Sequence, residues 1–245
     1  MSGETRAIVV GVGPEAGLGG ALSMRLAREG LHVFVAGRSA AKGASVGRTL
    51  RAAGGRATAV PTDTTVEKEV IALFDRAEAD GDGILDLAIY NAGNAAMGQL
   101  HDMEAGFFEG VWRVGCFGGF LVGREAVRRM LPRGRGTILF TGATASLRGR
   151  PTTTAFAAAK AGLRSLAQSM ARAYGPQGIH VGHVVVDGGI AGDKIVKGLP
   201  QFAEAMGDDG LISLTGLADA YWYLCQQPKA AWTHELDLRT YKESF

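Results

Sequence analysis

Short apolar runs alternate with helix-like segments along nearly the whole 245-residue chain, and this alternation limits the folds open to it. The runs are rich in β-branched residues and show no polar alternation, which is typical of strands buried on both faces. Between them, apolar residues recur at helical spacing and glycines mark the ends. We expect strands at 7–11, 32–36, 57–60, 85–90, 137–141, 179–186 and 235–238, and helices at 17–30, 40–53, 66–79, 103–131, 153–174 and 215–226.

Strands that alternate with helices form a parallel sheet covered by helices on both faces. Right-handed crossovers then give an α/β, doubly wound, Rossmann-like sheet of about seven strands. No internal repeat or linker interrupts the chain, so we predict a single domain over residues 1–245. Such sheets bind ligands beyond the carboxyl ends of their strands, so the residues just after each strand are the most informative about function.

Composition and charge argue against several classes of partner. The chain carries 26 basic and 24 acidic side chains, a balance that does not favour nucleic acid or an anionic membrane. No apolar run approaches the roughly 18–20 residues that cross a bilayer. The N-terminus lacks the features of a signal peptide, and Cys116 and Cys225 are typical of buried thiols in a reducing compartment. We therefore expect a cytoplasmic protein, and we assign no metal ligands.

A glycine-rich turn follows the first predicted strand and leads directly into the first predicted helix. It reads Gly-Val-Gly-Pro-Glu-Ala-Gly-Leu-Gly-Gly over residues 11–20. Glycine lets the backbone turn tightly and approach a ligand closely, and the helix offers unpaired N–H groups to a pyrophosphate. In a βαβ unit this predicts a dinucleotide-binding loop built around Gly13, Gly17, Leu18 and Gly19. The alternative is a tight turn that binds nothing.

The chain resembles the short-chain dehydrogenase/reductase family over nearly its whole length. Two motifs carry the resemblance, the loop spacing Gly13-x-x-x-Gly17-x-Gly19 and the element Asn91-Ala92-Gly93 after the fourth predicted strand. The resemblance implies that the 91–93 element supports the sheet and touches the cofactor, and that Asp63 hydrogen-bonds the adenine. It also implies a nicotinamide dinucleotide cofactor and a homodimer or homotetramer.

The end of the second predicted strand indicates which nicotinamide cofactor binds. An acidic residue there would bind the ribose hydroxyls of NAD, but Arg38-Ser39 stands in its place. Arg38 can form a forked contact with a 2′-phosphate, and Lys42 lies nearby in the sequence. Glu15 argues against a bound 2′-phosphate, because a carboxylate near the phosphates weakens a dianion site. We predict NADP(H) over NAD(H); the alternative is that Arg38 is an exposed cap of the following helix.

The family's catalytic pattern is only partly present. The resemblance implies a tyrosine as acid/base, a lysine that holds the ribose, a serine after the fifth strand and an asparagine after the fourth. Lys160 matches the lysine, whereas Phe156, Ala143 and Gly115 stand at the other three positions. Phenylalanine has no ionisable proton, and losing a general acid typically costs ~10²–10⁴ in rate. We therefore predict an atypical member of the family, in which Lys160 serves the ribose more than the proton transfer.

Other polar residues near the strand ends are candidates to replace the missing groups. Thr144 and Ser146 could supply a hydroxyl, or they could only satisfy backbone groups in a turn. Asp187 could be a new acid or, as we favour, a loop cap. His183 lies inside a predicted strand, where a satisfied core histidine is the favoured interpretation, and Asn94 follows the Asn-Ala-Gly element.

The segment after the sixth predicted strand is expected to cover the substrate. Ile190 is the expected backbone contact to the nicotinamide, and residues 188–214 form the covering loop and helix insertion. The helices predicted at 103–131 and 153–174 carry small residues and an apolar stripe, which in the family pair across a two-fold axis. The alternative is that these helices only cover the sheet.

These observations favour an NADP(H)-dependent oxidoreductase that acts on an unidentified small carbonyl or alcohol compound through a non-standard active site. The resemblance is the main support for redox chemistry. The alternative is a non-redox cyclase or isomerase, or a catalytically weak cofactor-binding pseudoenzyme on the same scaffold.

Overall fold

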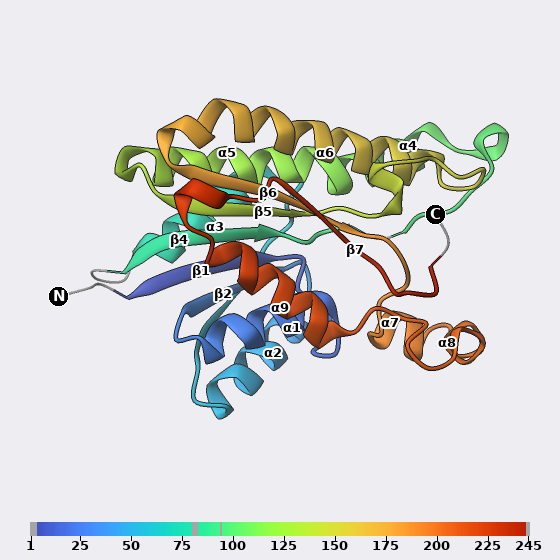
Figure 1. Ribbon diagram of the computed structural model, residues 1–245, viewed down its shortest axis with the longest axis horizontal. Coiled ribbons are helices and arrows are strands. Elements are labelled where there is room, and N and C mark those ends of the chain that lie inside the picture. The colour runs from blue at the N-terminus through green and yellow to red at the C-terminus, as the bar shows by residue number, and fades with distance from the viewer. Residues whose placement is uncertain (1–3, 80–82, 94, 244–245) are drawn as a thin grey trace.

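A single seven-stranded sheet organises the structure. The computed structural model describes residues 4–79, 83–93 and 95–243. The strand order is β3-β2-β1-β4-β5-β6-β7 and every neighbouring pair is parallel (Figure 1). The strands are β1 (Thr5–Val10), β2 (His32–Gly37), β3 (Arg56–Pro61), β4 (Ile84–Tyr90), β5 (Gly136–Thr141), β6 (Ile179–Val186) and β7 (Glu235–Leu238). The predicted doubly wound parallel sheet is confirmed.

Helices cover both faces of this sheet, as Figure 1 shows. The core on one face contains α1 (Leu18–Arg28), α2 (Ala40–Ala52) and α9 (Leu214–Cys225). The core on the other face contains α3 (Glu67–Glu78), α5 (Gly118–Met130) and α6 (Thr154–Tyr174). Strands β1 to β6 each contribute to both cores: in β1, Ala7 and Val9 pack on the first face, and Ile8 and Val10 on the second. Burial on both sides is why the strands show no polar alternation.

The strand order reverses between β1 and β4, and this switch point locates the ligand edge. The chain leaves β1 through α1 to β2 and β3, then returns through α3 to β4 on the other side of β1. After β1 and β4 the chain therefore continues to helices on opposite faces of the sheet. In open α/β sheets ligands bind at this point.

The helix predicted at 103–131 is more irregular than its sequence pattern indicated. It comprises η1 (Leu100–Asp102), α4 (Ala105–Trp112), a π-helical turn η2 (Arg113–Phe117), α5 and η3 (Leu131–Arg133). Gly115 lies within the π-helical turn, where a Cβ would come within 2.7 Å of the Ala159 Cβ on α6. The glycine therefore permits the close approach of η2 to α6, at the cost of regular α-helix geometry.

The remaining connections are short helices and turns. After β6 the chain forms α7 (Asp193–Val196) and α8 (Pro200–Met206), and three further 3₁₀ turns complete the fold: η4 (Thr144–Ser146), η5 (Gly175–Gln177) and η6 (Lys229–Ala231). Within the described ranges, none of the helices combines the length and apolar character needed to cross a bilayer.

Candidate functional site

The glycine-rich loop lies at the switch point and leaves one side of its backbone open. Gly11 has φ +83°, and a Cβ there would come within 2.5 Å of the Ala92 backbone nitrogen. A Cβ on Gly19 would come within 2.9 Å of the Val12 Cα, so this glycine also serves close packing. A Cβ on Gly13 would meet no atom within 4 Å. Gly13 therefore faces the open side, where a ligand can approach the backbone.

The start of α1 is suited to bind an anion. Gly17 is the N-cap residue, no side chain caps the helix, and its first turn contains no acidic residue. The first N–H groups of the helix therefore lack side-chain partners, and Leu18, the first helical residue, is buried beneath them. Together with the dipole of α1, they provide the anion-binding end that the sequence predicted.

The loops after β2 and β3 carry the predicted adenosine contacts. Arg38 is exposed and, within the described part of the chain, makes no hydrogen bond or ion pair. Ser39 caps α2, because its hydroxyl accepts a hydrogen bond from the Lys42 N–H at 3.3 Å. Asp63 accepts hydrogen bonds through Oδ1 from the backbone N–H and the hydroxyl of Thr65, at 2.9 and 2.8 Å. Arg38 is thus free to meet a ligand, while Ser39 and Asp63 also stabilise their own turns.

The carboxylate of Glu15 is directed away from the phosphate loop. The Ser45 hydroxyl on α2 donates a hydrogen bond to Glu15 Oε1 at 2.7 Å. Hydrogen bonds from Ser45 and then Thr49 lower the pKa of this exposed carboxyl. The sequence alone suggested that Glu15 would oppose a phosphate; the structure shows its charge engaged by α2.

The Asn-Ala-Gly element ties β4 to the phosphate loop. The Asn91 backbone N–H donates to the Val10 carbonyl at 3.0 Å, and its Nδ2 donates to the Gly11 carbonyl at 3.4 Å. Gly93 has φ +134°, and a Cβ there would lie 3.4 Å from the Lys160 Nζ. The element therefore links the phosphate loop to Lys160. Asn94 lies outside the described residues.

Lys160 is a buried cation at the end of β5. Its side chain extends from α6, is only 4% exposed, and donates a hydrogen bond through Nζ to the Thr141 carbonyl at 2.7 Å. Burial lowers the pKa of Lys160 to about 8. The Phe156 ring lies one helical turn earlier, with its centroid 5.8 Å from Nζ. An aromatic ring, without a phenol oxygen, therefore adjoins the ammonium group.

The two hydroxyls predicted after β5 lie in the same 3₁₀ turn, η4, but differ in exposure. Ser146 is 4% exposed, and its Oγ accepts a hydrogen bond from the Ala143 N–H at 3.1 Å. Thr144 is partly buried and donates its hydroxyl to Asp187 Oδ1. Asp187 is fully buried and serves as an anchor for this turn, which agrees with the favoured loop-cap interpretation.

The segment after β6 returns to the phosphate loop. Ile190 forms a parallel bridge with Ile212, and its carbonyl accepts a hydrogen bond from the Gly192 N–H at 2.7 Å. The Asp193 N–H donates to the Ala16 carbonyl at 2.7 Å, which fixes the start of α7 against the loop. This contact brings the predicted covering segment 188–214 beside the cofactor loop.

A family model for short chain dehydrogenases matches residues 6–194 of this chain. The chain belongs to the short-chain dehydrogenase family. It is 36% identical to cis-4-hydroxycyclohexanecarboxylate dehydrogenase of Sinomonas cyclohexanicum over 81% of this chain and 78% of that protein. It is 31% identical to 2-(S)-hydroxypropyl-CoM dehydrogenase 3 of Xanthobacter autotrophicus over 75% of this chain and 72% of that protein.

A solved structure supports the same family assignment. The crystal structure of a short-chain dehydrogenase from Rhodopseudomonas palustris is 38% identical in sequence and superposes with a TM-score of 0.82. The match covers 97% of this chain and 99% of that chain. The chain is therefore an oxidoreductase of the short-chain dehydrogenase type. The open Gly13 face and the uncapped start of α1 fit the nicotinamide dinucleotide that such enzymes use.

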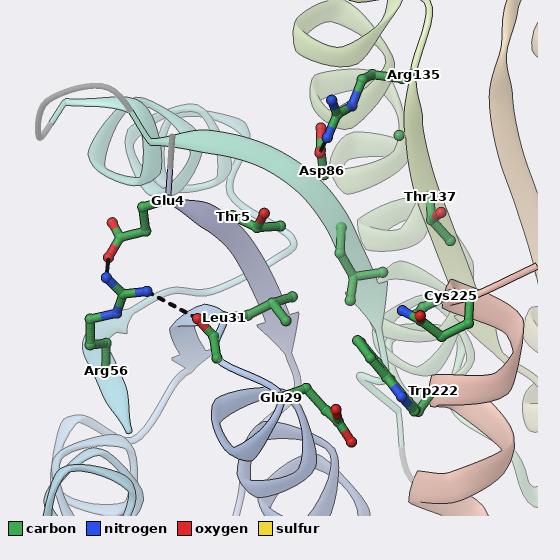
Figure 2. Close-up of a pocket in the computed structure, with 14 residues that line it drawn as sticks. Glu4, Thr5, Glu29, Leu31, Arg56, Asp86, Arg135, Thr137, Trp222 and Cys225 are labelled. Atoms are coloured by element: carbon green, nitrogen blue, oxygen red, sulfur yellow. Dashed lines mark hydrogen bonds and ion pairs between the residues drawn. The ribbon is translucent and has the colours of Figure 1, made fainter. Parts of the chain in front are cut away.

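A cleft lies at the opposite edge of the sheet, away from this dehydrogenase site. It encloses about 760 Å³ among the amino ends of the strands, with Glu4, Asp86, Arg135 and Trp222 in its lining (Figure 2). Its charged side chains pair within the protein, as Arg56 with Glu4 and Arg135 with Asp86. The cleft therefore lies apart from the loops at the carboxyl edge, and its charges are paired within the protein.

The sequence reasoning missed two residues that support the short-chain dehydrogenase site from β7 and its C-terminal end. Glu235 lies in β7 with its Oε2 3.0 Å from the His183 Nδ1, and the Arg239 guanidinium lies 3.4 Å from Asp187. No local spacing links either residue to the loop after β5. Only the parallel pairing of β7 with β6 brings them there.

Gly13→Ala is expected to weaken cofactor binding without loss of stability. Gly13 does not have a positive φ and the new methyl group would meet no protein atom, so the melting temperature should stay close to that of the wild type. A methyl group on the ligand side should raise the Kd for the dinucleotide about tenfold, through an overpacking cost of roughly 1–3 kcal/mol. Fluorescence titration and thermal unfolding measure both effects.

The matched control is Gly110→Ala on α4, where a Cβ also meets nothing within 4 Å. It should leave the dinucleotide Kd unchanged. An unchanged Kd for Gly13→Ala as well would show that the dinucleotide does not approach this loop.

Proposed function

We propose that this chain is an NADP(H)-dependent oxidoreductase that interconverts a ketone and a secondary alcohol, with Lys160 in place of a phenol as the proton-transfer group. The observation that carries the proposal is a buried ammonium group beside an aromatic ring at the carboxyl edge. The nicotinamide, when bound, supplies or accepts the hydride. The chain must hold the dinucleotide, orient the substrate oxygen and move one proton.

The charges around the adenosine end support NADP(H). Arg38 is exposed and unpaired within the described residues, and Glu15 is held by α2. Lys194 on α7 adds positive charge: burial, and then repulsion from Lys42, lowers the pKa of its side chain. Positive charge from both side chains at this end of the site favours a dianion such as a 2′-phosphate.

The sequence indicated a ribose-binding role for Lys160, but its burial also gives it a proton that can be transferred near neutral pH. Burial brings its pKa to about 8, which lies in the range where a general acid is effective. Among the described residues Nζ donates one hydrogen bond, to Thr141, so further N–H groups remain for the substrate side. By contrast, the Ser146 hydroxyl lies against His183 Nε2 and the Thr144 proton is engaged by Asp187. In reduction, the carbonyl carbon gains hydride and its oxygen gains the Lys160 proton, which solvent then restores.

The substrate is proposed to be a small hydroxylated or keto compound. Both relatives identified above are named as dehydrogenases of hydroxylated compounds. The covering segment 188–214 presents apolar Leu199 and Phe202, which are 57% and 46% exposed and could contact such a substrate. We propose that this segment covers the substrate. Its start is fixed against Ala16, which places the segment beside the phosphate loop.

A homodimer or homotetramer, located in the cytoplasm, completes the proposal. The surface of α4 and α5 exposes Phe107, Trp112 and Phe120 at 43%, 38% and 40%. Adjacent α6 exposes small residues, including Ala158 and Ala161. An apolar surface of this kind on two neighbouring helices favours burial against a second copy of the chain.

Arg38→Ala is expected to reduce the preference for NADP(H). Loss of a charged hydrogen bond to a phosphate costs about 1.5–3 kcal/mol, so the Kd for NADPH should rise roughly 10- to 100-fold while the Kd for NADH changes little. Titration of both cofactors measures the ratio. Arg28→Ala, at the far end of α1, is the control and should leave both constants unchanged. A wild-type preference for NADH would refute the cofactor assignment.

The pH dependence should report the ionisation of Lys160. The ammonium form donates the proton, so the rate of reduction should be constant below about pH 8 and fall tenfold per pH unit above it. Oxidation requires the neutral amine and should show the opposite dependence. Lys160→Met should lower the rate by ~10²–10⁴ and remove the break near this pH.

Exposed Lys68→Met is the matched control and should keep the full profile. A Lys160→Met variant that retained the break would assign the titrating group elsewhere and exclude Lys160 as the proton donor.

A further inference from the structure

Buried side chains at two positions of the β6 segment hold the two hydroxyls of the turn after β5. Ser146 Oγ lies 3.3 Å from the Nε2 of His183, which is 0% exposed inside β6. Thr144 donates its hydroxyl to Asp187, which is also 0% exposed and directly follows β6. The orientation of η4 therefore depends on polar groups in the core rather than on solvent.

The histidine belongs to a buried hydrogen-bonded chain whose directions follow from its charges. Burial lowers the pKa of His183 to about 4, so its imidazole is neutral at pH 7. Its Nδ1 lies 3.0 Å from the Glu235 carboxylate, which can only accept, so Nδ1 carries the hydrogen. Nε2 is then an acceptor for the Ser146 hydroxyl, and Ser146 Oγ in turn accepts from the Ala143 N–H at 3.1 Å.

Arg164 on α6 completes the chain at its outer end. Its Nε and Nη2 donate to the two oxygens of Glu235 at 2.6 and 2.7 Å. This forked pair lowers the pKa of the Glu235 carboxyl and keeps it ionised. The chain thus runs from Arg164 through Glu235, His183 and Ser146 to the Ala143 backbone, with every donor directed at an acceptor.

The same residue types in this order make up a serine–histidine–acid catalytic triad, but three facts argue against that role here. Ser146 Oγ already accepts a hydrogen bond from the Ala143 N–H, which engages the oxygen that would attack a substrate. An imidazole with a pKa near 4 is a poor base at neutral pH. The ion pair with Arg164 already compensates the Glu235 charge that would stabilise an imidazolium. This hydrogen-bonded series of side chains is suited to hold the turn after β5 in place.

Asp187 forms a second anchor that depends on the same edge strand. Guanidinium nitrogens of Arg148 and Arg239 each lie 3.4 Å from Asp187 Oδ2. Arg239 directly follows β7, and Glu235 begins it. The strand β7 and the residue after it therefore support both anchors of the turn. Gly142 packs closely against the first anchor, because a Cβ there would lie 2.4 Å from the His183 Nε2.

We propose that His183 and Asp187 are positioning residues, supported by β7, which fix η4 so that Ala143 and Thr144 present a rigid surface to the substrate. The inference rests on the proposed function in one respect, namely that the substrate carbonyl lies against this turn. Displacement of a positioning loop by about 1 Å costs up to ~10²-fold in rate, because the reacting atoms lose their alignment.

The test compares two buried histidines of the same strand. His183→Ala removes the link to Ser146 and should lower kcat for the NADPH-dependent reduction on the order of tenfold to a hundredfold, with the Kd for NADPH unchanged. His183→Gln places an amide oxygen near the Nε2 position and should restore part of this loss. Backbone amides of residues 143–146 should exchange hydrogen faster in His183→Ala than in the wild type.

The matched control is His180→Ala. His180 is 3% exposed in β6, but its ring contacts the Thr233 carbonyl at 2.9 Å and stacks on Trp232, away from η4. It should lose thermal stability but keep kcat and the slow exchange at 143–146. If His180→Ala lowers kcat as much as His183→Ala does, the effect is general destabilisation and the proposal is overturned.

A second variant and the independence of hydrogen exchange from substrate keep the positioning proposal testable. Ser146→Ala, a smaller change, should reproduce the faster exchange if His183→Ala fails to fold. Hydrogen exchange needs no substrate, so it tests the positioning chain even if the wild type reduces no carbonyl compound and the proposed function fails. Unchanged exchange at 143–146 in both variants would overturn the inference, whatever the enzyme assay shows.

Discussion

The close approach of Gly11 to the Asn91–Ala92 backbone is the constraint on which the ligand edge depends. A single Cβ at Gly11 would come within 2.5 Å of the Ala92 nitrogen, so only glycine lets the loops after β1 and β4 meet. Asn91 then holds the Gly11 carbonyl through its side chain. The contact fixes the switch point of the sheet, and with it the direction in which the open face of Gly13 and the first turn of α1 point.

The second determinant of the site is the desolvation of one cation. Lys160 is tied to Thr141 and enclosed by α6 and the 91–93 element, and burial lowers its pKa to about 8. A lysine in water would keep its proton several pH units higher and could not exchange it efficiently at neutral pH. The aromatic ring beside it carries no hydroxyl, and for this reason we propose that the amine transfers the proton. The proposed chemistry therefore follows from burial at one position.

The elements of the fold could be predicted from the sequence because their signals are local. Continuous β-branched apolar runs mark the strands, helical spacing and glycine mark the helices, and the Gly13–Gly19 spacing marks the phosphate loop. The direction of Glu15 and the anchors of η4 could not be predicted. Ser45 contacts Glu15, and Glu235 contacts His183, only through tertiary packing, which no spacing along the chain encodes.

The central claim is hydride transfer at this edge, and the most direct measurement is isotope transfer. The protein would be incubated with NADPH that carries deuterium at C4 and with a panel of small ketones, and the products analysed by mass spectrometry. The account predicts an alcohol with one deuterium on the carbinol carbon for each NADPH oxidised. A product that forms without deuterium while the cofactor stays reduced would contradict it, as would the absence of any NADPH oxidation across the panel.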